Sequence, residues 1–150
     1  MFDRVLLAFD GSQASKRALA DVTPIAKLTQ GIVKLLAVVS IPVDARVGWA
    51  TGGGLGEFPL SASQPTDEHL HMMLKSQMQT LKAMGLVVQS DVAFGDPVEE
   101  IVKAAALFQA DVIVLGHQRY NSWLERWWRG STAQAVMERA HCNVFISIHD

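Results

Sequence analysis

The sequence predicts an α/β fold, namely a doubly wound parallel sheet of five strands with helices on both faces. Two observations carry this prediction. Short apolar runs typical of buried strands, such as Val112-Ile113-Val114-Leu115, alternate along the chain with segments whose apolar residues recur at helical spacing. That alternation favours parallel strands covered on both faces. A chain of 150 residues also has the length of one domain, so we expect residues 1–150 to form a single unit.

The first strand and helix are predicted at the start of the chain. Val5-Leu6-Leu7-Ala8-Phe9 is an apolar run, and Asp10-Gly11-Ser12 turns from it into a helix. Pro24 is expected to kink or interrupt that helix, because proline lacks the backbone N–H that a helix interior uses. A second strand is predicted over 33–39. The residues that share the buried face of the helix are Ala14, Ala18, Leu19, Val22 and Ala26.

Residues 41–65 form a long segment that is rich in glycine, proline and serine and shows no sustained periodicity. A loop of this length in a compact domain is usually a lid, a binding loop or an unstructured connection. We expect a flap beside the ligand site, because the segment follows the second strand and therefore begins at the carboxyl edge of the sheet. The alternative is a connection without a role.

The remaining elements follow in regular order. Thr66 is expected to cap a helix that Gly85 ends. The predicted buried positions are Leu70, Leu74, Met78 and Leu81 in this helix, and Val98, Ile101, Val102 and Ala105 in the next one. The expected ranges are 86–94, 112–115 and 144–146 for the last three strands, and 97–110 and 131–140 for the last two helices.

The composition excludes several classes of function. Thirteen basic and fifteen acidic residues give a net charge of −2, so the overall field favours neither nucleic acid nor an anionic membrane. The single cysteine, Cys142, excludes an internal disulfide and is typical of a reducing compartment. The sequence has no apolar run of membrane-spanning length and its start lacks a signal-peptide pattern. We therefore expect a cytoplasmic protein without a membrane or nucleic-acid partner.

Glycines at two predicted strand ends indicate a ligand site. Asp10-Gly11-Ser12 follows the first strand and Gly116 follows the fourth, so the two would meet at the carboxyl edge of the sheet if these strands are neighbours. Gly130-Ser131-Thr132 then opens a helix, and the amides at a helix N-terminus attract phosphate. The ordinary alternative is that Gly116 only turns the chain, while Ser131 and Gln134 form a capping box.

Positive charge gathers between Gly116 and Gly130. The basic residues there are His117, Arg119, Arg126 and Arg129, opposed by Glu125. This cluster suits a polyphosphate, and the alternative is a solvated basic loop. The sequence contains no nucleophile elbow, Walker loop or metal-ligand cluster, so an enzyme is the least favoured class of function.

Taken in order, these motifs resemble the universal stress protein family, and the resemblance covers almost the whole chain. It implies a sheet in the order 3-2-1-4-5 and a homodimer in which the last strand, with Val144, Phe145 and Ile146, pairs across the dimer. It also implies ATP as a ligand, with Mg²⁺ held by the phosphates. The segments that carry the resemblance are 5–12, 35–39, Gly95-Asp96-Pro97, 110–116, Gly130-Ser131-Thr132 and 143–146.

The resemblance also implies a nucleotide site. Adenine and ribose contacts would come from the ends of the first two strands, nucleoside contacts from the end of the fourth strand, and phosphate contacts from the start of the last helix. The implied residues are, in that order, Asp10 and Val38, Leu115 and Gly116, and Gly130, Ser131 and Thr132, with Ala8 and Arg119 beside them. No catalytic or metal-ligating residue is implied.

The chain departs from the pattern of ATP-binding members at two points. Arg119 stands where they have a second glycine, and ten residues rather than nine separate this position from Gly130. The guanidinium either fills space left for phosphate or pairs with it. Gly116-His117 also looks like the start of a branch that does not bind ATP, yet the chain keeps Gly130-Ser131-Thr132.

The sequence therefore predicts a dimeric stress-response binding module that binds an adenine nucleotide. One alternative is a nucleotide-free adaptor that acts through its dimer and its surfaces. The other is a slow nucleotide hydrolase or phosphotransferase with Asp10 as its carboxylate, although Asp10 is equally suited to capping the first helix.

Overall fold

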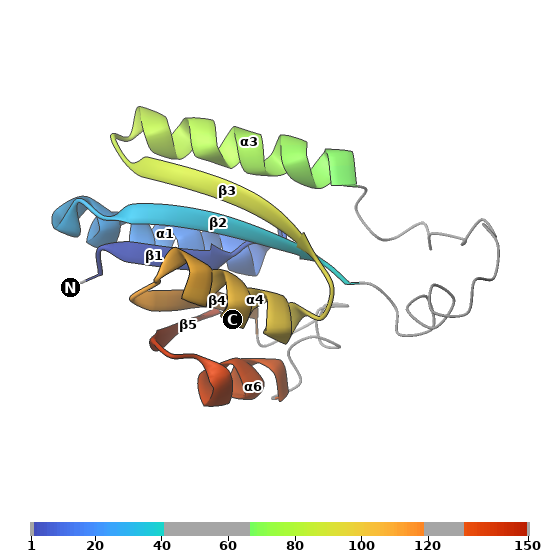
Figure 1. Cartoon of the computed structure of the whole chain (residues 1–150). Coiled ribbons are helices and arrows are strands. Elements are labelled where there is room, and N and C mark those ends of the chain that lie inside the picture. The colour runs from blue at the N-terminus through green and yellow to red at the C-terminus, as the bar shows by residue number, and fades with distance from the viewer. Residues whose placement is uncertain (1, 41–66, 119–130, 150) are drawn as a thin grey trace.

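Five parallel strands form one sheet in the order β3-β2-β1-β4-β5 (Figure 1). The structure is a computed structural model and describes residues 2–40, 67–118 and 131–149. The predicted fold class and the strand order implied by the resemblance are both confirmed. The strands are β1 (Arg4–Ala8), β2 (Ile32–Val39), β3 (Val87–Phe94), β4 (Val112–Gln118) and β5 (Asn143–His149).

Helices cover both faces of the sheet (Figure 1). Helices α1 (Gln13–Thr29) and α3 (Asp67–Ala83) pack on one face, which we call the α1/α3 face. Helices α4 (Pro97–Phe108) and α6 (Ser131–Arg139) pack on the other, the α4/α6 face. Each face has its own apolar core, and strand side chains alternate between the two because successive residues of a strand point in opposite directions.

The alternation assigns each strand position to a face. In β1, Val5 and Leu7 belong to the α1/α3 core, and Leu6 belongs to the α4/α6 core. In β4, Val114 lies on the α1/α3 side and Leu115 on the α4/α6 side. The same alternation assigns a face of the sheet to the residues that directly follow these strands.

Helix α1 begins where the sequence predicts and passes through Pro24 without interruption. The predicted face is buried, with Val22 and Ala26 packed on either side of the proline. Pro24 itself is exposed, so the carbonyl that loses its helical partner lies on the flank open to water. The expected break is therefore wrong, because the apolar contacts on both sides of Pro24 hold the helix together.

Two strands are longer than their apolar runs. The ladder between β4 and β5 continues through Gly116↔Ser147 to Gln118↔His149. Gly116 is consequently inside a strand and does not end one, which corrects the expected position. The apolar run predicts the buried centre of a strand, whereas the neighbouring strand decides where its hydrogen bonding ends.

Helices α3 and α4 are each followed closely by a residue with positive φ. Gly85 has φ +85° after α3, in agreement with its predicted role as a helix terminator. Helix α4 stops at Phe108, before the predicted end, because Gln109 adopts a left-handed conformation and its N–H bonds back to Ala105 and Ala106. Phe108 completes the buried face of α4, together with Ile101 and Ala105.

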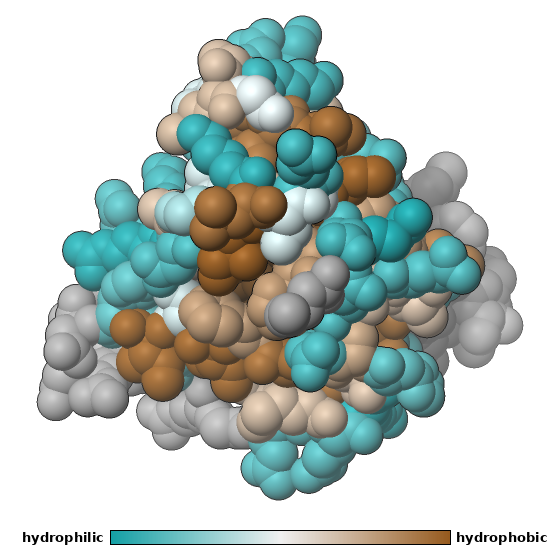
Figure 2. All heavy atoms as spheres, turned by 90° about the vertical axis from the view of Figure 1, so that its left-hand side faces the viewer, coloured by the Kyte–Doolittle hydropathy of each residue, from teal (hydrophilic) through white to brown (hydrophobic). Residues whose placement is uncertain are grey.

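The amino-terminal edge of the sheet is shown in Figure 2. Exposed apolar side chains at this end of the molecule include Leu28, Met84, Val87 and Leu107. Figure 2 shows apolar side chains across the centre of this face, bordered by polar ones. No helix in the described part of the chain has the length and apolar composition to cross a membrane. The predicted flap at 41–65 lies outside the described residues.

Candidate functional site

The centre of the candidate site is the carboxyl edge of β1 and β4, which are hydrogen-bonded neighbours. The connections from β1 to β2 and from β2 to β3 use helices on the α1/α3 face. Those from β3 to β4 and from β4 to β5 use helices on the α4/α6 face. The chain therefore changes direction between β1 and β4, which is where open parallel sheets bind ligands. The expectation that the first and fourth strands are neighbours is confirmed.

Small side chains form a floor on the α4/α6 face of this edge. Ala8 at the end of β1, Val38 near the end of β2 and Ala93 near the end of β3 are all partly buried against the α4/α6 core. Val38 and Ala93 are directly opposite each other in the ladder between β2 and β3. None of these side chains extends far from the sheet, because two are alanines and one is a valine.

Ala93 was missed at the level of sequence. The run Val92-Ala93-Phe94 indicates a strand, but the pairing of Ala93 with Val38 depends on the register between β2 and β3. Leu115, by contrast, is completely buried in the α4/α6 core. Its side chain is therefore not part of the surface.

Asp10 is held in a fixed turn after β1. Its Oδ1 atom accepts a hydrogen bond of 2.9 Å from the backbone N–H of Ser12. Ser12 is the N-cap of α1, and its hydroxyl accepts from the N–H of Ser15 at 3.1 Å. Asp10 thus orders the turn without being the cap itself, and its partly exposed carboxylate is fixed at the carboxyl edge of β1.

Gly116 has a packing role that the sequence did not predict. It lies between Leu115 and His117, so its missing side chain would point to the α1/α3 face. A Cβ atom there would overlap the carbonyl oxygen of Ala14 and lie 2.5 Å from the carbonyl carbon. Glycine is therefore needed for the first turn of α1 to approach β4.

His117 lies on the same face as Leu115 by the period of two, and it is partly buried. It is the member of the predicted basic cluster that the structure describes. Arg119, Arg126, Arg129 and Gly130 lie outside the described residues.

Helix α6 begins at Ser131, as the glycine-rich motif predicts, and Thr132 continues its first turn. The described side-chain bond of Gln134 runs from its amide nitrogen to Glu138 Oε1 at 2.9 Å, away from the start of the helix. The predicted capping box involves the Ser131 side chain, which lies outside the side chains that the structure describes.

Two other helices that start at this edge are capped by their own chain. Ser12 caps α1, and Asp96 caps α4 by accepting from the N–H of Glu99 at 3.0 Å. Side chains thus already occupy amides at the starts of α1 and α4.

The free thiol of Cys142 lies directly before β5. Burial raises the pKa of the Cys142 thiol, which disfavours the reactive thiolate. Within residues 2–40, 67–118 and 131–149, no group of three or more His, Cys, Asp or Glu side chains is arranged to hold a metal ion.

Relatives of known sequence align along almost the whole chain. The family model described as "Universal stress protein family" matches residues 1–147. The chain is 26% identical to universal stress protein Sll1388 of Synechocystis, over 99% of each chain. It is 27% identical to universal stress protein MJ0531 of Methanocaldococcus jannaschii, over 97% of this chain and 82% of that protein.

Solved structures of the same fold include UspA from Lactobacillus plantarum, with a TM-score of 0.69, 19% identity and 97% coverage of both chains. A universal stress protein in complex with cAMP has a TM-score of 0.66 and 20% identity, with 99% of this chain and 98% of that chain covered. One from Archaeoglobus fulgidus in complex with dAMP has a TM-score of 0.62 and 16% identity, with 97% and 98% covered. The fold and the family match together show that the chain belongs to the universal stress protein family.

Proposed function

We propose that the chain is a cytoplasmic, single-domain stress-response module that binds an adenine nucleotide at the carboxyl edge of its sheet. The observation that carries this proposal is the floor formed by Ala8, Val38 and Ala93 beside the fixed carboxylate of Asp10. Solved relatives in complex with cAMP and dAMP support the adenine class of ligand.

The floor and the turn would divide the recognition of the nucleotide between them. A flat base would lie on the small apolar side chains, where a larger side chain would exclude it. The Asp10 carboxylate would accept hydrogen bonds from ribose hydroxyls or an exocyclic amine. The phosphates would then extend toward the first turn of α6, at Ser131 and Thr132.

ATP with Mg²⁺ is the specific ligand that we propose. The metal would be held by the phosphates and would offset their repulsion from Asp10. Binding without turnover is the proposed activity.

Calorimetric titration with Mg²⁺ and ATP tests the proposal. The wild-type protein should give a saturable heat, and Ala93→Leu should weaken binding about tenfold or more because the added atoms fill the floor. Ala106→Leu makes the same change on the exposed side of α4 and should bind like the wild type. Gly130→Val should also weaken binding, through the phosphate end.

The absence of heat from the wild type up to millimolar ATP would remove nucleotide binding and leave the nucleotide-free adaptor. Equal heats from the wild type, Ala93→Leu and Gly130→Val would place the ligand elsewhere. Arg119→Gly then distinguishes the two roles of the arginine. Tighter binding would show that Arg119 obstructs phosphate, and weaker binding would show that it pairs with phosphate.

We also propose a homodimer in which β5 pairs with the β5 strand of a second copy. β5 is at the edge of the sheet, and apolar side chains are exposed on both of its faces, with Phe145 40% and Ile148 53% exposed. Met137 of α6, which packs beside β5, is 50% exposed. An uncovered edge with this composition favours pairing with another strand.

A further inference from the structure

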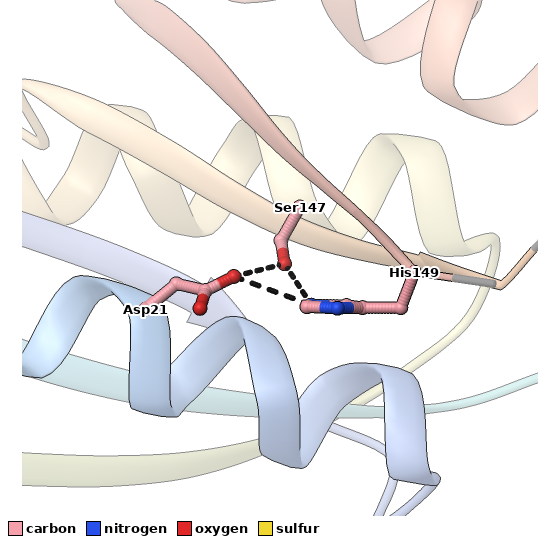
Figure 3. Close-up of polar contacts among 3 residues, drawn as sticks. All are labelled: Asp21, Ser147 and His149. Carbon is pink, nitrogen blue, oxygen red and sulfur yellow. Dashed lines mark hydrogen bonds and ion pairs between the residues drawn. The ribbon is translucent and has the colours of Figure 1, made fainter.

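A polar cluster joins the end of the edge strand β5 to helix α1 (Figure 3). The Ser147 hydroxyl lies 2.6 Å from Asp21 Oδ2 and 2.6 Å from His149 Nε2. The same His149 nitrogen lies 3.2 Å from Asp21 Oδ2. Figure 3 shows Ser147 and His149 pointing from β5 toward Asp21 on α1. We call these three residues the β5 latch.

The distances determine where the protons lie. A carboxylate only accepts hydrogen bonds, so the Ser147 hydroxyl donates to Asp21. The Ser147 oxygen then accepts from His149, whose Nε2 atom must carry hydrogen. The neutral imidazole meets this condition in its Nε2–H tautomer, and the imidazolium meets it as well.

The latch is not a hydrolytic triad. In a triad, one ring nitrogen contacts the serine and the other contacts the carboxylate, whereas here Nε2 contacts both. Ser147 is also 3% exposed, so a substrate does not reach its hydroxyl. The arrangement therefore links two elements and does not activate a nucleophile.

The latch is accessible to protons from solvent. The side chains of His149 and Asp21 are 23% and 44% exposed. Arg17, one turn before Asp21 on the same flank of α1, is the other charged residue of that flank. The positions opposite Ser147 and His149 on β4 are Gly116 and Gln118, which carry no charge. Phe145 precedes them on the same face of β5.

We propose that the β5 latch responds to pH. It holds the carboxyl end of β5 against α1 more tightly when His149 is protonated. The neutral imidazole gives one hydrogen bond to Ser147. The imidazolium adds a positive charge to the ring whose Nε2 atom lies 3.2 Å from the Asp21 carboxylate, and this attraction strengthens the link between β5 and α1. Closing is therefore favoured at lower pH, because a lower pH favours the imidazolium.

The sign of the effect reverses at lower pH. The additional stability depends on the ionised Asp21 carboxylate, so it is lost once Asp21 is protonated. In the described sheet, β5 pairs with one strand, β4. Helix α1 packs on the α1/α3 face of β5 and is its main support there. The proposal does not depend on nucleotide binding.

Hydrogen exchange of the full-length protein tests the latch. The measured quantity is the protection of the β5 amides relative to those of α4, corrected for intrinsic exchange, at about pH 6 and about pH 8. The wild type should open about two- to fivefold less often at the lower pH, which is the effect expected of a partly exposed ion pair. His149→Gln and Asp21→Asn retain polar side chains of similar size and should abolish this difference.

Two further variants make the test specific. His141→Gln removes an exposed histidine before β5 and should keep the pH response of the wild type. Ser147→Ala should increase opening at both pH values by the same factor, because the direct contact between Asp21 and His149 remains. An unchanged pH response in His149→Gln or Asp21→Asn would overturn the proposal, and so would its loss in His141→Gln.

Discussion

Replacing Gly116 by alanine is expected to lower the free energy of unfolding by about 3 kcal/mol. The new Cβ would overlap the Ala14 carbonyl oxygen and lie 2.9 Å from the backbone nitrogen of Ser15. These are backbone atoms of the first turn of α1, so rotation of a side chain cannot relieve the contact. Either α1 or β4 must move. Urea unfolding followed by circular dichroism at fixed protein concentration measures the loss.

Gly85→Ala is the matched control for this substitution. An added Cβ at Gly85 meets nothing within 4 Å, but the residue has φ +85°. The control should therefore lose about 1 kcal/mol, from backbone strain alone. If Gly116→Ala unfolded at the same urea concentration as the wild type, the close approach of α1 to β4 would be wrong. Gly116 would then serve only the ligand or the turn.

Val144→Pro is expected to convert the proposed dimer into a monomer while the fold is kept. The N–H of Asn143 bonds to the Asp111 carbonyl on the β4 side. Because amides of a strand alternate in direction, the N–H of Val144 points to the open edge. Proline there removes a donor from the dimer ladder and none from the ladder with β4. Sedimentation velocity measures the change.

Val144→Thr retains the amide and should remain dimeric, which controls for loss of the valine side chain. Phe145→Pro instead removes an amide directed toward β4, so it should destabilise the fold itself. A wild-type protein that sediments as a monomer would contradict the proposed interface. So would a Val144→Pro variant that sediments as the wild-type dimer does.

The buried parts of the fold were predictable because they depend on local patterns. Val5 to Phe9 and Val112 to Leu115 are apolar runs, and they form the two central strands. The ends of β4 and β5 were not predictable. His117 and Gln118 are polar, and they extend the strand because the backbone of β5 is aligned with them. A ladder depends on the partner's position, which a single stretch of sequence does not contain.

The candidate site was predictable in part for the same reason. Glycine at 116 signals a close approach, yet the sequence does not say whether a ligand or Ala14 makes it. The β5 latch escaped prediction because Asp21 and Ser147 are 126 positions apart, and each alone is an ordinary polar residue on an amphipathic element. Their meeting depends on how α1 packs beside β5.

The strand order also affects the chain while it is being synthesised. β1 gains β2 as a neighbour early, through pairs such as Arg4↔Ile32, but its other edge stays open until Val112–Gln118 has been made. Val5, Leu6 and Leu7, which are at most 1% exposed in the finished fold, border that open edge. A nascent chain that pauses before β4 therefore presents an apolar strand edge to its surroundings, the type of surface that favours aggregation. The order 3-2-1-4-5 makes completion of this domain depend on its fourth strand.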